Sequence, residues 1–86
     1  INQIYPANDL MTKAREMADL LASGPPLVYA AIKQIVREAE AMTFQDGMNR
    51  ITRRQFATVD TLYASEDQLE GARAFAEKRD PIWKGQ

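Results

Sequence analysis

Carboxylates at helical spacing are the side chains of this sequence best placed for proton transfer. Glu66 and Glu70 are four residues apart, and Asp67 and Glu70 are three apart, so each pair would share one face of a helix. An acid/base pair also needs a cleft that desolvates one of its members. Acidic residues at a helix start have a second explanation, because they interact favourably with the helix dipole. We expect this structural role for the three carboxylates.

Three arginines, Arg50, Arg53 and Arg54, form the second charged group. Such a cluster can contact an anion or a phosphate group. It can also form a solvated helix face with an ion pair to Asp46 or Glu66. The sequence favours this second interpretation.

The residue types that are missing exclude several kinds of chemistry. The 86 residues contain no Cys and no His, which excludes disulfides, thiol nucleophiles, imidazole bases and ordinary zinc sites. The 11 basic and 12 acidic residues give a net charge of −1, whereas a nucleic-acid-binding domain carries a concentrated basic surface. No metal-ligand spacing or phosphate-binding glycine loop is present. We therefore expect no metal, no resident cofactor and no nucleic-acid partner.

Length and hydropathy limit the architecture. A chain of 86 residues is typical of one small domain, and its 45% hydrophobic content is ordinary for a globular protein. No run of about 18 apolar residues could span a membrane. No basic segment followed by an apolar one opens the chain, as it would in a signal peptide. The absence of Cys is compatible with the cytosol, and we expect a cytoplasmic protein without a membrane partner.

The elements that must position these side chains are helices, because apolar residues recur at helical spacing along most of the chain. The predicted helices span residues 9–23, 26–41, 44–63 and 66–79. Gly24 followed by Pro25 ends the first of them. Ser65 and Gln68 form a capping box at the start of the last. The sequence therefore predicts an all-α fold of four helices.

Two features indicate that other chains complete the core. The predicted helix 44–63 is too long for its short neighbours to cover, so its far half should protrude or meet another chain. Trp83 lies outside the last helix, where a large aromatic residue can anchor on another surface. The chain also opens with Ile1 rather than Met, which suits either an ordinary extended terminus or a piece cut from a larger protein. We expect an oligomer.

The end of the chain carries a more specific pattern. Residues 65–71 (SEDQLEG) and 74–85 (AFAEKRDPIWKG) resemble the C-terminal signature of the enoyl-CoA hydratase/isomerase (crotonase) superfamily. Upstream, Leu10 with Ala14, and residues 24–33, are similar to the two preceding helices of that family, so the resemblance covers essentially the whole chain. Within the superfamily, residues 75–85 are especially like those of the carnitinyl-CoA dehydratases.

The resemblance implies that residues 1–86 are a helical lid and trimerisation domain, the C-terminal domain of the ClpP/crotonase-like fold without its ββα-spiral core. In the family, that core supplies two backbone N–H groups as an oxyanion hole and one or two carboxylates as acid and base. They transfer protons at carbons next to a CoA thioester. The parent protein would be an acyl-CoA hydratase or dehydratase. No catalytic residue would lie in this chain, which would be inactive alone.

The resemblance also implies contacts with CoA. Lys78, in the Glu-Lys-Arg motif, corresponds to a family lysine that approaches the phosphate-bearing adenosine of CoA, commonly across a subunit boundary. Val59 falls where a side chain lines the adenine, and Tyr63 is a second candidate one turn later. The alternative for Lys78 is a purely structural interaction with the helix dipole. The implied partners are acyl-CoA, the chain's own N-terminal core and neighbouring subunits in a trimer or hexamer.

Two alternatives stay open at this point. The chain could be a free-standing helical protein-interaction module with no enzymatic parent. It could also be the same domain of a crotonase-type isomerase, hydrolase or decarboxylase, because the carboxylates that distinguish these reactions would lie in the core. The sequence upstream of Ile1 separates the first alternative from an enzyme, since an enzyme requires a strand-rich core with an oxyanion segment there.

Overall fold

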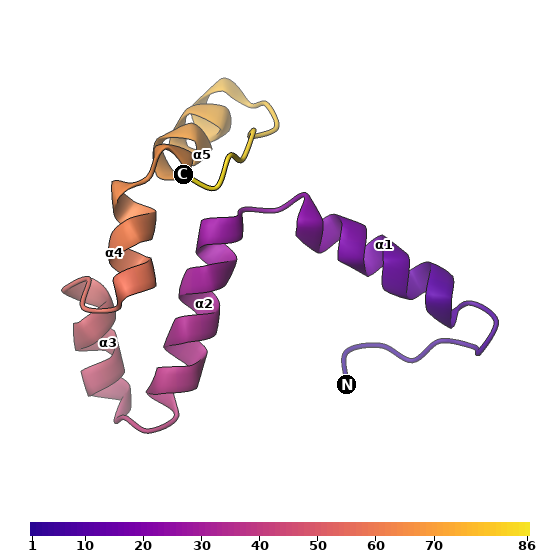
Figure 1. Ribbon diagram of the computed structural model, residues 1–86, viewed down its shortest axis with the longest axis horizontal. Coiled ribbons are helices and arrows are strands. Elements are labelled where there is room, and N and C mark those ends of the chain that lie inside the picture. The colour runs from indigo at the N-terminus through magenta and orange to yellow at the C-terminus, as the bar shows by residue number, and fades with distance from the viewer.

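The computed structural model describes residues 1–86 and contains helices but no strand (Figure 1). The helices are α1 (Leu10–Ala22), α2 (Pro26–Ala39), α3 (Phe44–Thr52), α4 (Ala57–Ala64) and α5 (Glu66–Glu77). The predicted all-α class is confirmed. Three predicted helices agree with α1, α2 and α5 to within two residues at each end.

The prediction of one helix over residues 44–63 is wrong, because the chain breaks between Thr52 and Ala57 into α3 and α4. Arg54 has a φ angle of 53°, and this left-handed conformation ends a right-handed helix. It costs an L-residue about 1–2 kcal/mol. The break lets the ring of Phe56 turn inward until it is 0% exposed, and burying such a ring contributes about 2 kcal/mol.

The small core lies between α2 and the pair α3 and α4. Its buried members are Ala31, Phe56 and Val59, and the partly buried Ile35, Met42, Ile51 and Leu62 pack against them. The far half of the predicted long helix therefore does not protrude. As α4, it runs beside α2 and also contacts α5 (Figure 1).

Two side chains of α2 connect it to the following helices. Gln34 accepts a hydrogen bond of 3.0 Å from the backbone N–H of Thr58 in the first turn of α4, and α4 has no capping side chain of its own. Glu38 forms an ion pair of 3.3 Å with Arg50. The guanidinium of Arg50 lies 4.5 Å from the centroid of the Phe56 ring. This arginine therefore pairs with Glu38, and not with the predicted Asp46 or Glu66.

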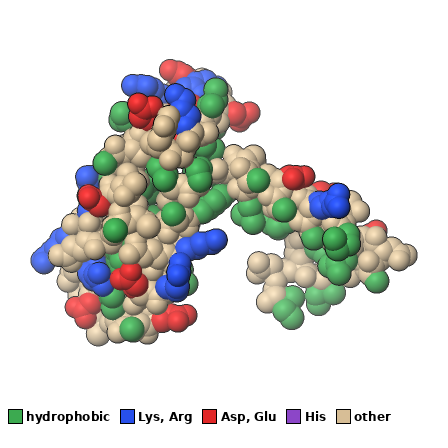
Figure 2. Space-filling model, viewed as in Figure 1, with side chains coloured by type: hydrophobic (Ala, Val, Ile, Leu, Met, Phe, Trp, Pro, Cys, Tyr) green, Lys and Arg blue, Asp and Glu red, His purple; other side chains and the backbone are tan.

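Helix α1 stands apart from the rest of the molecule, connected to α2 through Gly24 and Pro25 (Figure 1). None of its residues is buried. Hydrophobic side chains gather along it (Figure 2). The large ones are exposed by 44% to 65%, and they are Leu10, Met11, Met17, Leu20 and Leu21. The apolar face of α1 thus has no partner within these 86 residues.

None of the five helices combines the length and the apolar character that crossing a bilayer requires.

Candidate functional site

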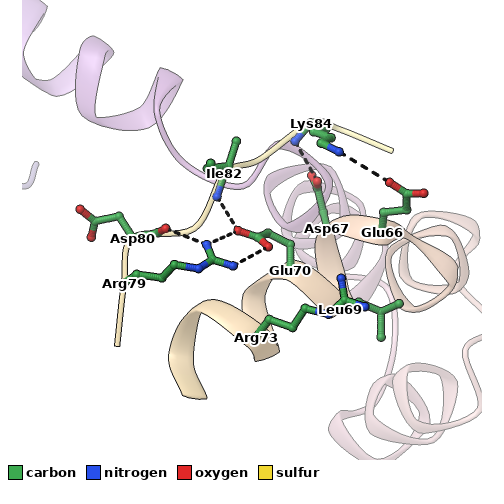
Figure 3. Close-up of a pocket in the computed structure, with 9 residues that line it drawn as sticks. All are labelled: Glu66, Asp67, Leu69, Glu70, Arg73, Arg79, Asp80, Ile82 and Lys84. Carbon is green, nitrogen blue, oxygen red and sulfur yellow. Dashed lines mark hydrogen bonds and ion pairs between the residues drawn. The ribbon is translucent and has the colours of Figure 1, made fainter. Parts of the chain in front are cut away.

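Helix α5 and the C-terminal tail, residues 78–86, enclose a hollow of about 510 Å³ (Figure 3). The hydroxyl of Ser65 accepts a hydrogen bond of 3.1 Å from the backbone N–H of Gln68, which confirms the predicted cap at the start of α5. Because the helix starts there, Asp67 and Glu70 lie one turn apart and both face the tail (Figure 3).

Asp67 holds the end of the tail. Its carboxylate is 2% exposed and accepts hydrogen bonds of 2.8 Å from the backbone N–H groups of both Lys84 and Gly85. Its own backbone N–H donates to the carbonyl of Gln86 at 3.1 Å. Gly85 has a φ angle of 73°, a conformation that glycine adopts without strain. The role of Asp67 is therefore more specific than an interaction with the helix dipole.

Glu70 holds the start of the tail. It accepts hydrogen bonds of 2.6 and 2.9 Å from the guanidinium of Arg79, and one of 2.9 Å from the backbone N–H of Ile82. Arg79 donates further to the carboxylate of Glu77 at 2.6 Å and to the carbonyl of Asp80 at 3.1 Å. The tail is thus fixed at both ends by carboxylates of α5.

These contacts shift the pKa values of Glu70 and Arg79 in opposite directions. The hydrogen bonds from Arg79, and next the one from the Ile82 N–H, lower the pKa of Glu70 to about 2. The carboxylates of Glu70 and Glu77 raise the pKa of Arg79 above its ordinary value. A carboxylate with such a low pKa is a poor general base near neutral pH. The geometry therefore favours the structural role for these acids over acid/base chemistry.

Trp83, in the middle of the tail, packs on the same helix. A Cβ atom at Gly71 would lie 3.2 Å from Cη2 of the Trp83 indole. The absence of a side chain at Gly71 therefore lets the indole approach the helix closely. Trp83 and Tyr63 are both among the residues that line a second hollow of about 300 Å³. Trp83 thus contacts its own chain and stays partly exposed, and its anchoring on another surface remains a prediction.

The structure does not bring the three predicted CoA residues together. Val59 is 3% exposed and packs with Ala31 and Phe56 in the core. Tyr63, one turn later on α4, is 48% exposed. Tyr63 precedes the N-terminal end of α5, whereas Lys78 follows its C-terminal end. The 12 residues of α5 span about 18 Å.

The aromatic ring of Tyr63 is covered on one face by an arginine. The guanidinium carbon of Arg54 lies 4.4 Å from the ring centroid, a distance typical of a cation–π contact. The left-handed conformation that ends α3 is what places Arg54 near α4. Of the predicted arginine cluster, Arg50 and Arg54 are therefore both engaged by aromatic rings, and Arg53 is the residue that caps α3.

Lys78 occupies an unusual backbone conformation for its residue type. The helix ends at Glu77, and Lys78 follows with a φ angle of 55°. Its N–H donates to the carbonyl of Phe75, and the N–H of Arg79 donates to that of Ala74. This hydrogen-bond pattern is a Schellman motif, in which glycine is the usual residue at the position of Lys78. The side chain is exposed and forms none of the ion pairs of the molecule.

Phe75 is a surface residue of α5. It lies one turn before Lys78 and is 88% exposed. An exposed aromatic ring beside an unpaired cation can stack on a nucleotide base while the cation binds phosphate. Helical spacing alone could not separate this position from Leu69 or Ala72, because all three fit one apolar stripe.

The acidic side chains form no metal site. Nowhere do three or more of them gather closely enough to hold an ion.

Comparison with known proteins connects this arrangement with a family. The profile of the enoyl-CoA hydratase/isomerase family matches residues 1–86. The chain belongs to this family. It is 41% identical over 85 residues to carnitinyl-CoA dehydratase of Salmonella paratyphi B (strain ATCC BAA-1250 / SPB7) and, equally, to that of Salmonella heidelberg (strain SL476). These alignments cover 99% of the chain and 33% of each relative, so the chain spans about a third of their length.

Solved structures of the family contain the same arrangement of helices. The enoyl-CoA hydratase from Bacillus anthracis superimposes with a TM-score of 0.79 at 28% identity, over 95% of this chain and 30% of that one. A probable enoyl-CoA hydratase/isomerase from Mycobacterium abscessus superimposes with a TM-score of 0.78 at 32% identity, over 100% of this chain and 32% of that one. The placement of these helices in a crotonase-type fold is thereby confirmed.

Proposed function

We propose that this chain is the C-terminal helical domain of a crotonase-type acyl-CoA hydratase or dehydratase. In this proposal it covers the acyl-CoA site and takes part in oligomerisation. The observation that carries the proposal is the family match over all 86 residues, together with 41% identity to carnitinyl-CoA dehydratases. That identity favours a dehydratase over the isomerase, hydrolase and decarboxylase alternatives. A match to an enzyme family along the whole chain also favours an enzymatic parent over a free-standing interaction module.

The catalytic groups belong to the core domain in this proposal. The chain has no His or Cys, and its best-placed carboxylates, Asp67 and Glu70, are committed to holding the tail. Proton transfer next to the thioester would be carried out by carboxylates of the core, with its backbone N–H groups stabilising the enolate. The substrate is a CoA thioester, and the reaction needs no resident cofactor.

The contribution of this chain to substrate binding is a contact with the nucleotide end of CoA. The ammonium of Lys78 binds a phosphate group, and the exposed ring of Phe75 offers a stacking surface beside it. Tyr63 is a second aromatic contact on α4. Val59 has 3% exposure, so any contribution to that contact comes through the position of α4.

The exposed apolar surface supports a role in assembly. The hydrophobic residues of α1 lack a partner in this chain, and Phe44 at the start of α3 is 83% exposed. Large exposed apolar patches mark interaction surfaces. In this proposal the core domain and neighbouring subunits, in a trimer or hexamer, cover them.

An activity assay of the segment and of the complete enzyme tests this function. Both proteins are mixed with crotonyl-CoA and, separately, with carnitinyl-CoA, and the hydration state of the acyl group is followed. We expect turnover by the complete enzyme and none by the 86-residue segment. Turnover by the segment alone would contradict the proposal, as would a complete enzyme that acts on neither thioester.

A further inference from the structure

We propose that Glu70 and Arg79 are positioning residues for Lys78. Their ion pair fixes the backbone on both sides of the lysine, and Arg79 engages the carboxylates of Glu70 and Glu77, so that neither glutamate pairs with the ammonium. This inference rests on the proposed function and deepens it, because it explains how one exposed lysine is kept available for the phosphate group of a CoA thioester.

The residues on both sides of Lys78 are held in one hydrogen-bond network. Arg79 is held by Glu70 through two hydrogen bonds, by the Glu77 carboxylate, and by the Asp80 carbonyl. Glu77 immediately precedes Lys78, and Arg79 and Asp80 follow it. Ile82 also donates to the same Glu70 carboxylate (Figure 3). The side chain of Lys78 takes no part in the network that surrounds it, and Asp80 takes part only through its backbone carbonyl.

The charges near Lys78 are distributed so that Arg79, and not the lysine, forms the ion pairs. Glu70 and Glu77 are the acidic residues whose carboxylates the network contains, and Arg79 binds both of them, whereas it contacts Asp80 at the backbone carbonyl only. The planar guanidinium matches a carboxylate with two parallel hydrogen bonds, which a lysine ammonium cannot do. Arg79 therefore removes from Lys78 the glutamates with which it could pair. The ammonium stays exposed and forms no ion pair.

The backbone conformation of Lys78 also depends on its surroundings. A non-glycine residue in the left-handed region persists only where its surroundings hold it there. Lys78 has a φ angle of 55°, and the tail that follows it is fastened to α5 through Glu70. Without the ion pair, the turn could relax and the ammonium would sample many directions. Loss of the ion pair would therefore weaken binding of the phosphate group by Lys78, and it would leave the chemistry at the thioester unaffected.

The test measures KM in the complete enzyme for an acyl-CoA and for the matching acyl-pantetheine, which lacks the phosphate-bearing nucleotide. We expect Glu70→Gln and Lys78→Ala each to raise KM for the acyl-CoA about fivefold, the size of losing one exposed charged contact, without a similar rise for the pantetheine thioester. In the Lys78→Ala background, Glu70→Gln should add nothing, because Glu70 acts through Lys78.

Two further variants keep the test decisive. Arg79→Lys retains the charge but loses the paired hydrogen bonds, and we expect it to raise KM for the acyl-CoA in the same selective way. Asp67→Asn is the matched control, because Asp67 also holds the tail but lies at the other end of α5. It should lower the melting temperature without a selective change of KM.

The possible outcomes distinguish the positioning role of Glu70 and Arg79 from the phosphate contact of Lys78. Additive effects of Glu70→Gln and Lys78→Ala, or equal losses with both substrates, would overturn the positioning role. An effect of Lys78→Ala with none from Glu70→Gln and Arg79→Lys would also overturn it, while the phosphate contact stands. No effect of Lys78→Ala itself would instead refute the contact on which the inference rests.

Discussion

Gly71 and Trp83 lie so close together that even a Cβ atom at Gly71 would press on the indole ring. A Cβ atom at Gly71 would lie 3.2 Å from the indole, although glycine inside a helix costs about 1 kcal/mol relative to alanine. The tail returns to α5 at this point, between its attachments to Glu70 and to Asp67. The contact thus makes the only tryptophan of the chain a reporter of whether the tail is docked.

Replacing Gly71 with Leu should undock the tail. The added branched side chain would occupy the volume of the indole ring, so Trp83 must move into solvent. We expect the tryptophan emission of the 86-residue chain to shift to longer wavelength, with unchanged far-ultraviolet circular dichroism of the helices.

The control for this substitution is Gly47→Ala. Gly47 is also helical, but a Cβ atom there would meet nothing within 4 Å. We expect a gain of about 1 kcal/mol in the free energy of unfolding from helix propensity and no change of emission. An unshifted spectrum in Gly71→Leu would mean that the indole does not rest on α5.

Acid should release the tail through Glu70. Its pKa is about 2 in the folded chain against an ordinary value of 4.5, so the charged form is favoured by folding. The stabilisation is therefore fully present above about pH 4.5 and is lost as the pH falls toward 2. Tryptophan emission should shift to longer wavelength between about pH 4.5 and pH 2. The Glu70→Gln variant should lack the part of this shift that protonation of Glu70 causes. A titration curve unchanged by Glu70→Gln would assign the transition to other carboxylates.

Lys78→Gly should separate the two explanations of this lysine. Glycine adopts the left-handed conformation freely, so we expect a rise of about 1 kcal/mol in the free energy of unfolding. Binding of acyl-CoA by the complete enzyme should weaken at the same time, because the ammonium is gone. If Lys78 served the helix dipole alone, the variant would lose that interaction and substrate binding would not change.

Gln34 should stabilise the start of α4 from outside that helix. Its side chain accepts from the Thr58 backbone N–H, which α4 itself leaves without a cap. We expect Gln34→Ala to lower the free energy of unfolding by about 1 kcal/mol, the usual cost of losing such a cap. Gln55→Ala is the matched control, since its exposed side chain caps no helix. Equal melting temperatures of the two variants would contradict the assignment.

The sequence predicted those features that depend on neighbouring residues. The serine cap at Ser65 and the stop at Gly24 and Pro25 follow from hydrogen bonding and backbone freedom within a few positions, and they are found where expected. The break between α3 and α4 could not be foreseen in this way. It places a non-glycine residue, Arg54, in the left-handed region, and what stabilises it is the burial of Phe56 against a distant helix.

The roles of the acidic residues show the same limit. Helical spacing correctly placed Asp67 and Glu70 on one face of a helix. Their partners are backbone N–H groups 12 to 18 residues later in the chain. No periodic pattern encodes such contacts, because a backbone donor has no sequence signature. Asp67 and Glu70 are part of the family motif, and the structure shows that they hold the C-terminal tail.

The central claim is that the end of α5 binds the nucleotide part of a CoA thioester in a crotonase-type enzyme. The most direct measurement is KM of Lys78→Ala, in the complete enzyme, for an acyl-CoA and for the matching acyl-pantetheine. The account predicts a KM about fivefold higher for the acyl-CoA and an unchanged KM for the acyl-pantetheine. Equal changes for the two thioesters, or no change for either, would contradict it.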